Sequence, residues 1–70
     1  MNKKIISRVI EEASYIIDTN KTIREVSIVF GVSKSTVHKD MREKLLLLDS
    51  TLYQKVSSVL EYHTYIKHIR

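Results

Sequence analysis

The sequence predicts an all-α fold, a small four-helix domain that contains a helix-turn-helix and no wing. The 70 residues include no proline and a single glycine, Gly31, whereas a sheet of this size needs several tight turns built from those two residues. Apolar side chains instead recur at intervals of three and four residues along most of the chain, which is the period of a buried helix face. A chain this short forms one domain, so we take residues 1–70 as a single unit.

The first predicted helix covers about residues 2 to 18. One apolar stripe runs along it through Ile6, Ile10, Ala13 and Ile17, and this stripe is expected to face the core. The charged side chains lie elsewhere on the helical wheel, and we interpret the neighbours Glu11 and Glu12 as a solvated pair. Residues 18–21 are expected to form a loop, in which an asparagine can adopt the left-handed conformation.

The second predicted helix covers residues 23–30. Thr22 and Glu25 form a Thr-x-x-Glu capping box at its start, in which each side chain satisfies a free backbone group of the first turn. Val26, Val29 and Phe30 are among its apolar positions. Gly31 comes directly after it and is expected to end it in the left-handed region.

A third helix is predicted from 34 to 45, with Ser33 as its N-cap. Val37, Met41 and Leu45 recur every four residues and are expected to face inward. The stretch 46–49 could extend this helix, but we interpret it as a buried connection. A fourth helix is predicted over about residues 50–70, and it ends in a cluster of basic residues.

Residues 22–45 have the features that a helix-turn-helix requires. A small residue, Ser27, stands where the second helix must pass close to the first, Gly31 supplies the turn, and Val37 faces back into the angle. In such a unit the second helix enters the major groove of DNA. The sequence therefore predicts double-stranded DNA as the partner, with the helix over 34–45 as the recognition helix.

The predicted contacts come from both helices of this unit and from the end of the chain. The leading end of the third helix and the start of the second would meet base edges and phosphates. The candidate DNA-binding residues are Thr22, Arg24, Ser33, Lys34, Ser35, Thr36, His38, Lys39, Arg42, Lys67, His68 and Arg70.

Net charge agrees with an anionic partner and composition excludes several other classes. Twelve Lys and Arg against eight Asp and Glu give a formal charge of +4, which favours nucleic acid. Without cysteine there are no disulfides or thiolate metal sites, and His63 and His68 are spaced wrongly for metal ligands on one helix face. No phosphate-binding loop or nucleophile–base arrangement is found. We expect no cofactor, no enzymatic activity, no membrane segment and a cytoplasmic location.

The stretch Phe-Gly-Val-Ser-Lys-Ser-Thr-Val-His-Lys-Asp over 30–40 resembles the core of the stage III sporulation protein D family. Leu-Glu-Tyr-His over 60–63 and Ile-Lys-His-Ile-Arg over 66–70 resemble the end of the same domain. The resemblance implies a regulator that activates and represses genes in the mother cell of endospore-forming bacteria. It also implies binding as a monomer, with the basic C-terminal end on adjacent DNA, and we add RNA polymerase as a candidate contact.

Two departures from the family pattern stand out. Family members commonly continue beyond the position of Arg70 with a further basic tail, and their connection over 46–48 contains proline where this chain has leucines.

Other interpretations of the residues stay open. A basic helical face also suits a protein-interaction module, sigma-like or adaptor-like, with an acidic partner, or a non-specific RNA binder. Lys67, His68 and Arg70 at a helix end would equally complement the negative end of the helix dipole. Composition and spacing fit a monomer and a dimer alike.

Overall fold

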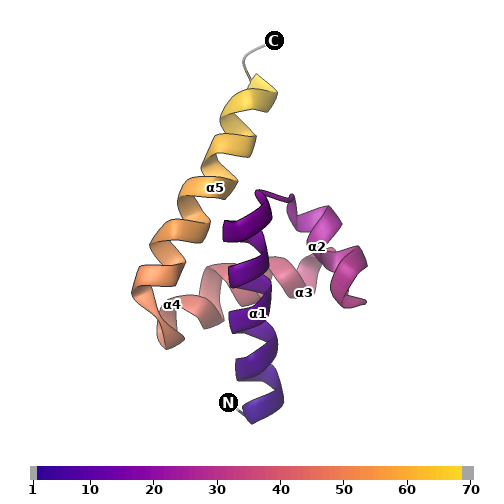
Figure 1. Ribbon diagram of the computed structural model, residues 1–70, viewed down its shortest axis with the longest axis vertical. Helices are drawn as coiled ribbons and strands as arrows, with labels where there is room; N and C mark the ends of the chain where they lie inside the picture. Colours follow the sequence, from indigo (N-terminus) through magenta and orange to yellow (C-terminus); the bar gives the residue numbers. More distant parts are fainter. Residues whose placement is uncertain (1, 69–70) are drawn as a thin grey trace.

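The computed structural model describes the backbone of residues 2–68 and the side chains of residues 2–61. It confirms the all-helical prediction, with no strand in the described part of the chain. The helices are α1 (Lys3–Thr19), α2 (Ile23–Phe30), α3 (Lys34–Lys39), η1 (Asp40–Lys44), α4 (Leu45–Leu48) and α5 (Ser50–His68). The consecutive helices α3, η1 and α4 form one segment, in which η1 is a turn of π-helix. The structure thus has the four predicted helical segments (Figure 1).

Local chemistry sets the start of each segment. Short polar side chains accept hydrogen bonds from the first free N–H groups, as the capping rule requires. Asn2 accepts from Ile5 at 2.9 Å, and Asp49 accepts from the N–H groups of Thr51 and Leu52 at 3.0 and 3.1 Å. The predicted boundaries of α1 and α2 hold to within one residue.

Left-handed residues end α1 and α2. Asn20 follows α1 with φ 57°, and Gly31 follows α2 with φ 67°. The N–H of Val32 then donates to the carbonyl of Ser27 at 3.0 Å, which closes the end of α2. Both residues occupy the positions that the sequence predicted for them.

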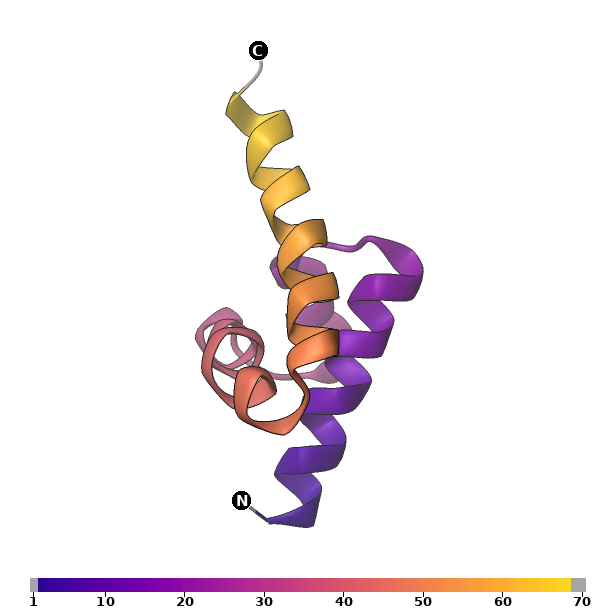
Figure 2. The same ribbon diagram turned by 90° about the vertical axis from the view of Figure 1, so that its left-hand side faces the viewer.

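The core lies where α1 meets the other segments. Figure 1 shows α1 between α5 on one side and α2 on the other, and in the turned view of Figure 2 α1 lies along one side of the fold, with the segment around α4 on the opposite side. Tyr15 on α1 also meets Phe30 on α2 edge to face, with ring centroids 5.8 Å apart. The completely or almost completely buried apolar side chains are Val9, Ala13, Ile16, Val26, Val37, Met41, Leu45 and Val56. The inward row predicted for the third helix is confirmed by this set.

The prediction that Glu12 belongs to a solvated pair is wrong. Its side chain is completely buried, whereas Glu11 is exposed. The buried face of α1 is centred on Val9, Ala13 and Ile16, and position 12 falls on that face because residues three and four apart are neighbours on a helix. Glu12 is therefore enclosed by the packing of its own helix against the rest of the fold.

The prediction of a buried connection over 46–49 is also wrong. Residues 45–48 continue the helix as α4, and only Leu45 among them is fully buried. Leu46 is 48% exposed and Leu47 is 79% exposed, because a helix that buries one side turns its intervening residues outward. Val29, predicted as an apolar position of α2, is 56% exposed for the same reason.

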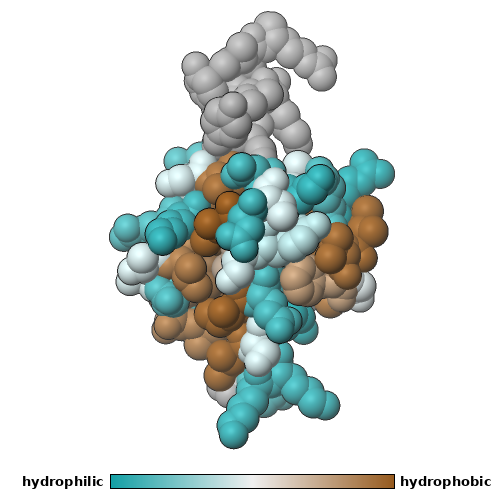
Figure 3. Space-filling view, viewed as in Figure 1, coloured by the Kyte–Doolittle hydropathy of each residue, from teal (hydrophilic) through white to brown (hydrophobic). Residues whose placement is uncertain are grey.

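On one face of the molecule, exposed apolar side chains are interleaved with polar ones. Figure 3 shows brown and teal residues mixed across one face, with hydrophilic side chains at the N-terminal end of α1. No helix in the described part of the chain has the length and apolar character needed to cross a membrane.

Candidate nucleic-acid interface

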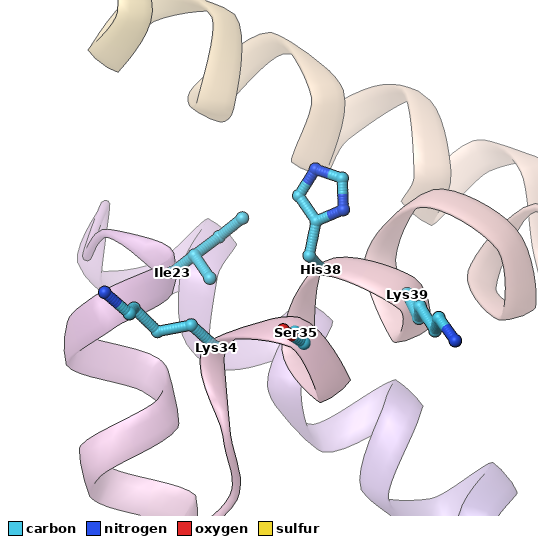
Figure 4. A pocket seen from close by; sticks show the side chains of 5 residues that line it. All are labelled: Ile23, Lys34, Ser35, His38 and Lys39. Atoms are coloured by element: carbon cyan, nitrogen blue, oxygen red, sulfur yellow. The ribbon is translucent and has the colours of Figure 1, made fainter.

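The exposed side of α3 carries four polar side chains, Lys34, Ser35, His38 and Lys39. Together with Ile23, the first residue of α2, they line an open groove (Figure 4). The two lysines point away from each other at the ends of this groove, and Ser35 and His38 lie between them. We call these four polar residues the α3 basic face.

The α3 basic face has no acidic counterpart within the described residues. The ion pairs among the described residues all lie elsewhere, and they join Arg8 to Glu12, Arg8 to Asp40, Lys21 to Glu25 and Lys44 to Asp40. Lys34 and Lys39 take part in none of them. Their charges therefore face solvent, where a Lys ammonium can donate to an anionic or acceptor-rich ligand.

Ser33 and Thr36 form the hydrogen bonds that cap the start of α3. The Ser33 hydroxyl accepts from the Thr36 N–H at 3.1 Å, and the two hydroxyl groups share a further hydrogen bond at 2.9 Å. Thr36 is half-buried. These two predicted contact residues thus set the start of α3, and the side chains of Lys34 and Ser35 extend from the turn they fix.

The start of α2 lies next to the groove through Ile23. Thr22 caps this helix by accepting from the Glu25 N–H at 3.2 Å, and its hydroxyl donates to the Glu25 carboxylate at 3.3 Å. Hydrogen bonding to Lys21 is the main reason that the pKa of Glu25 is lowered. Arg24 is exposed beside this capping box.

The remaining predicted contacts lie further along the chain. Arg42 is exposed on η1. The side chains of Lys67 and His68, and the whole of Arg70, lie outside the described residues.

A cluster of four ionisable side chains, two of them completely buried carboxyl groups and two of them partly exposed cations, lies next to the end of α3, and sequence reasoning missed it. Arg8 donates to Asp40 from Nε at 3.0 Å and from Nη2 at 3.1 Å. Lys44 Nζ lies 3.2 Å from the same carboxylate, and Arg8 Nε lies 4.0 Å from Glu12. Glu12 and Asp40 are both completely buried. The position of Glu12 among Val9, Ala13 and Ile16 is the sign in the sequence that could have revealed it.

The pKa values of the two buried carboxyl groups are shifted in opposite directions. Burial, followed by the hydrogen bond with Asp40 and its negative charge, raises the pKa of Glu12 to about 8. Burial alone would also raise the pKa of Asp40, but hydrogen bonds with Glu12, Arg8 and Lys44 together lower it. Arg8 is held in its charged form, since its hydrogen bonds to Asp40 raise its pKa further. At neutral pH the cluster holds a neutral Glu12 beside an ionised Asp40.

These features define a small, all-helical, basic domain in which α3 presents two lysines that form no ion pair with any described residue. The family model for stage III sporulation protein D matches residues 2–70. The chain is also 44% identical to stage III sporulation protein D of Bacillus subtilis (strain 168), over all of this chain and 75% of that protein. No solved structure matches the chain.

The chain therefore belongs to the stage III sporulation protein D family, as its motifs indicated. It is a sporulation-associated regulator, and the family is not one of enzymes.

Proposed function

We propose that the protein is a sequence-specific, double-stranded DNA-binding transcriptional regulator, which controls mother-cell gene expression during endospore formation. The observation that carries this proposal is the α3 basic face, which is exposed and free of carboxylate partners within the described residues. Membership of the family supports the link to sporulation.

The geometry around Gly31 supports a helix-turn-helix over residues 22–45. Ser27 on α2 is buried, Gly31 has the positive φ that the turn needs, and Val37 on α3 is completely buried. A helix-turn-helix places its second helix in the major groove, with the N-terminal residues of that helix on the base edges. Here the second helix begins with the α3 basic face.

The side chains of this face suit the chemistry of the groove. Lys34 and Lys39 carry donors that match the guanine O6 and N7 acceptors or a phosphate oxygen. Ser35 can donate or accept, and His38 offers a ring nitrogen. Arg24 and Arg42 stand further out and would hold the phosphate backbone, which fixes register without reading sequence.

The basic C-terminal end is proposed to bind the neighbouring DNA. A lone recognition helix without a dimer partner needs a second anchor, and each extra phosphate contact releases counterions. Lys67, His68 and Arg70 would supply this anchor. Binding as a monomer is part of the proposal.

Selection of bound sequences from a pool of random duplexes tests the proposal. One asymmetric site is expected for a monomer, whereas an inverted repeat would indicate a dimer. A salt titration on the selected duplex should then give a slope of about −4.5 on logarithmic axes if about five phosphates are contacted. Absence of saturable duplex binding would reject the proposal and favour a helical adaptor with an acidic partner.

A contact with a protein partner, such as RNA polymerase, is a second candidate function. Ile28 is 72% exposed and Val29 is 56% exposed near the end of α2. Exposed apolar residues that sit together can mark a protein interface. Binding of the protein to purified RNA polymerase should weaken in an Ile28→Ser variant that still binds duplex DNA normally.

A further inference from the structure

The helical segment over residues 34–48 contains a π turn immediately after the α3 basic face. Its widened hydrogen bonding is seen where the N–H of Leu45 donates to the carbonyl of Asp40, five residues earlier. Turns of this kind are rare and occur often at functional sites. The turn begins at Asp40, the residue that follows Lys39.

The π turn keeps one side of the segment against the core. Residues four apart on an α-helix drift by about 40° around its axis with each step. Val37, Met41 and Leu45 are nevertheless all buried to 1% exposure or less. A wider turn has fewer degrees of rotation per residue, so it offsets this drift and lets all three face inward.

Asp40 ties the first residue of the π turn to α1. Its carboxylate accepts two hydrogen bonds from Arg8, at 3.0 and 3.1 Å, and has Lys44 Nζ 3.2 Å away at the other end of the turn. A bidentate Arg–carboxylate pair fixes orientation as well as distance. Asp40 therefore contacts a cation on α1 and another on η1 at once.

The α3 basic face points away from this cluster. Asp40 is completely buried, while its sequence neighbour Lys39 and the preceding His38 are exposed. The rotation of the 34–48 segment about its own axis determines both the burial of Asp40 and the exposure of Lys39 and His38. Any roll that moved the Asp40 carboxylate from Arg8 would also redirect Lys39 and Ser35.

We infer that Arg8 and Asp40 are positioning residues for DNA recognition, which fix the rotation of the 34–48 segment and thereby aim the α3 basic face. This inference rests on the proposed DNA-binding function. Arg8 acts from α1, and two of its nitrogen donors are engaged with Asp40. Its role is to hold a fixed rotation, and a loss of that rotation should reduce sequence discrimination more than general affinity.

The test uses two variants that change net charge in opposite directions, Arg8→Gln and Asp40→Asn. Affinity is measured for the duplex that the wild type selects from a random pool and for one random duplex of equal length. A purely electrostatic effect would make Arg8→Gln weaker and Asp40→Asn tighter on both duplexes, because phosphate attraction follows charge. Loss of positioning instead lowers the preference for the selected duplex in both variants, by about tenfold.

Lys4→Gln is the matched control for charge. It removes one cation from the same helix at an exposed position that makes no ion pair among the described residues. The preference of this variant for the selected duplex should equal that of the wild type. Arg8→Lys keeps the charge but not the bidentate geometry, and it should restore part of the preference lost in Arg8→Gln. Because Arg8→Lys is the milder change, it also gives a result if the other variants fail to fold.

A spectroscopic measurement separates positioning from stability. In folded Asp40→Asn protein without DNA, the backbone amide resonances of residues 34–39 should shift. If both variants keep the wild-type preference within about threefold at temperatures where they are folded, the inference is overturned. If the wild type itself shows no preference for any duplex, the proposed function fails instead, and the two failures are thereby distinguished.

Discussion

Glu12 on α1 and Asp40 on η1 form a pair of completely buried carboxyl groups, of which only Asp40 has a cation within direct hydrogen-bonding distance. No donor group of the described residues reaches either oxygen of Glu12. Burial and the neighbouring Asp40 raise the pKa of Glu12 to about 8, and in its protonated form the Glu12 carboxyl has an O–H that can donate to an acceptor. This arrangement stores a proton in the interior at neutral pH.

The first prediction concerns the pH dependence of stability. The pKa of Glu12 is about 8 in the folded protein, above its ordinary value of 4.5. The folded state thus binds more protons than the unfolded state between these values, and the free energy of unfolding falls as pH rises through this window. Between pH 6 and pH 9 the Glu12 contribution should amount to a loss on the order of 2 kcal/mol. Urea denaturation at several pH values measures it.

A Glu12→Gln variant should lose most of this pH dependence and be more stable than the wild type at pH 9. The amide keeps the size of the carboxyl group and cannot ionise. Glu11→Gln, at the exposed neighbouring position, is the control and should follow the wild-type profile. Parallel profiles for all three proteins would contradict a proton held on Glu12.

The second prediction compares two leucines of α4. Leu45 is completely buried and Leu47 is 79% exposed. Leu45→Ala should lower the free energy of unfolding by about 2–5 kcal/mol, because it leaves a cavity. Leu47→Ala should change it by less than about 0.5 kcal/mol. Equal losses in thermal or denaturant unfolding would mean that the segment over 46–49 is buried after all.

The third prediction concerns the turn after α2. An added Cβ at Gly31 would meet no atom within 4 Å, so the cost of Gly31→Ala comes from its φ of +67° alone. This cost should be about 1 kcal/mol of unfolding free energy. Asn20→Gly makes the reverse change at the other left-handed position, φ 57°, and should leave stability nearly unchanged. Calorimetry on both variants checks the difference, and equal stability of the two variants would contradict a cost from the positive φ of Gly31.

The fourth prediction tests base reading by α3. Lys39→Ala should lower affinity for the selected duplex by about 1–3 kcal/mol and relax sequence preference at one base position. Lys55→Ala removes the same charge from an exposed position on α5 outside the proposed interface. Filter binding to selected and random duplexes compares the two variants. If Lys39→Ala lowered affinity by the same small amount for the selected and the random duplex, Lys39 would not contact a base.

The fifth prediction tests the C-terminal anchor. Lys67→Ala should weaken binding to selected and random duplexes alike, since a phosphate contact carries no sequence information. The slope of the salt titration should decrease in magnitude by about 1. An unchanged slope would support a role for Lys67 in complementing the helix dipole instead.

Much of the proposed interface could be predicted because its parts are local. Ser33 at the start of α3 and Gly31 before it follow from capping and backbone rules that depend on a few neighbouring residues. The exposure of Lys34 and Lys39 follows from the inward row of apolar residues on the same segment. Their proposed contacts with DNA stay predictions.

The sequence by itself determined the four helical segments, the N-caps Thr22 and Ser33 and the inward row through Val37, Met41 and Leu45. The spacing of Glu12 from Val9 and Ile16 already places it on the buried face of α1, whereas only the tertiary structure decided that Arg8 meets Asp40 and that a π turn follows Lys39. Helix caps and apolar periodicity depend on residues only a few positions apart, so they can be predicted from the local sequence. The charged cluster joins side chains 32 positions apart, and its burial depends on how α1 packs against η1, which no local pattern specifies.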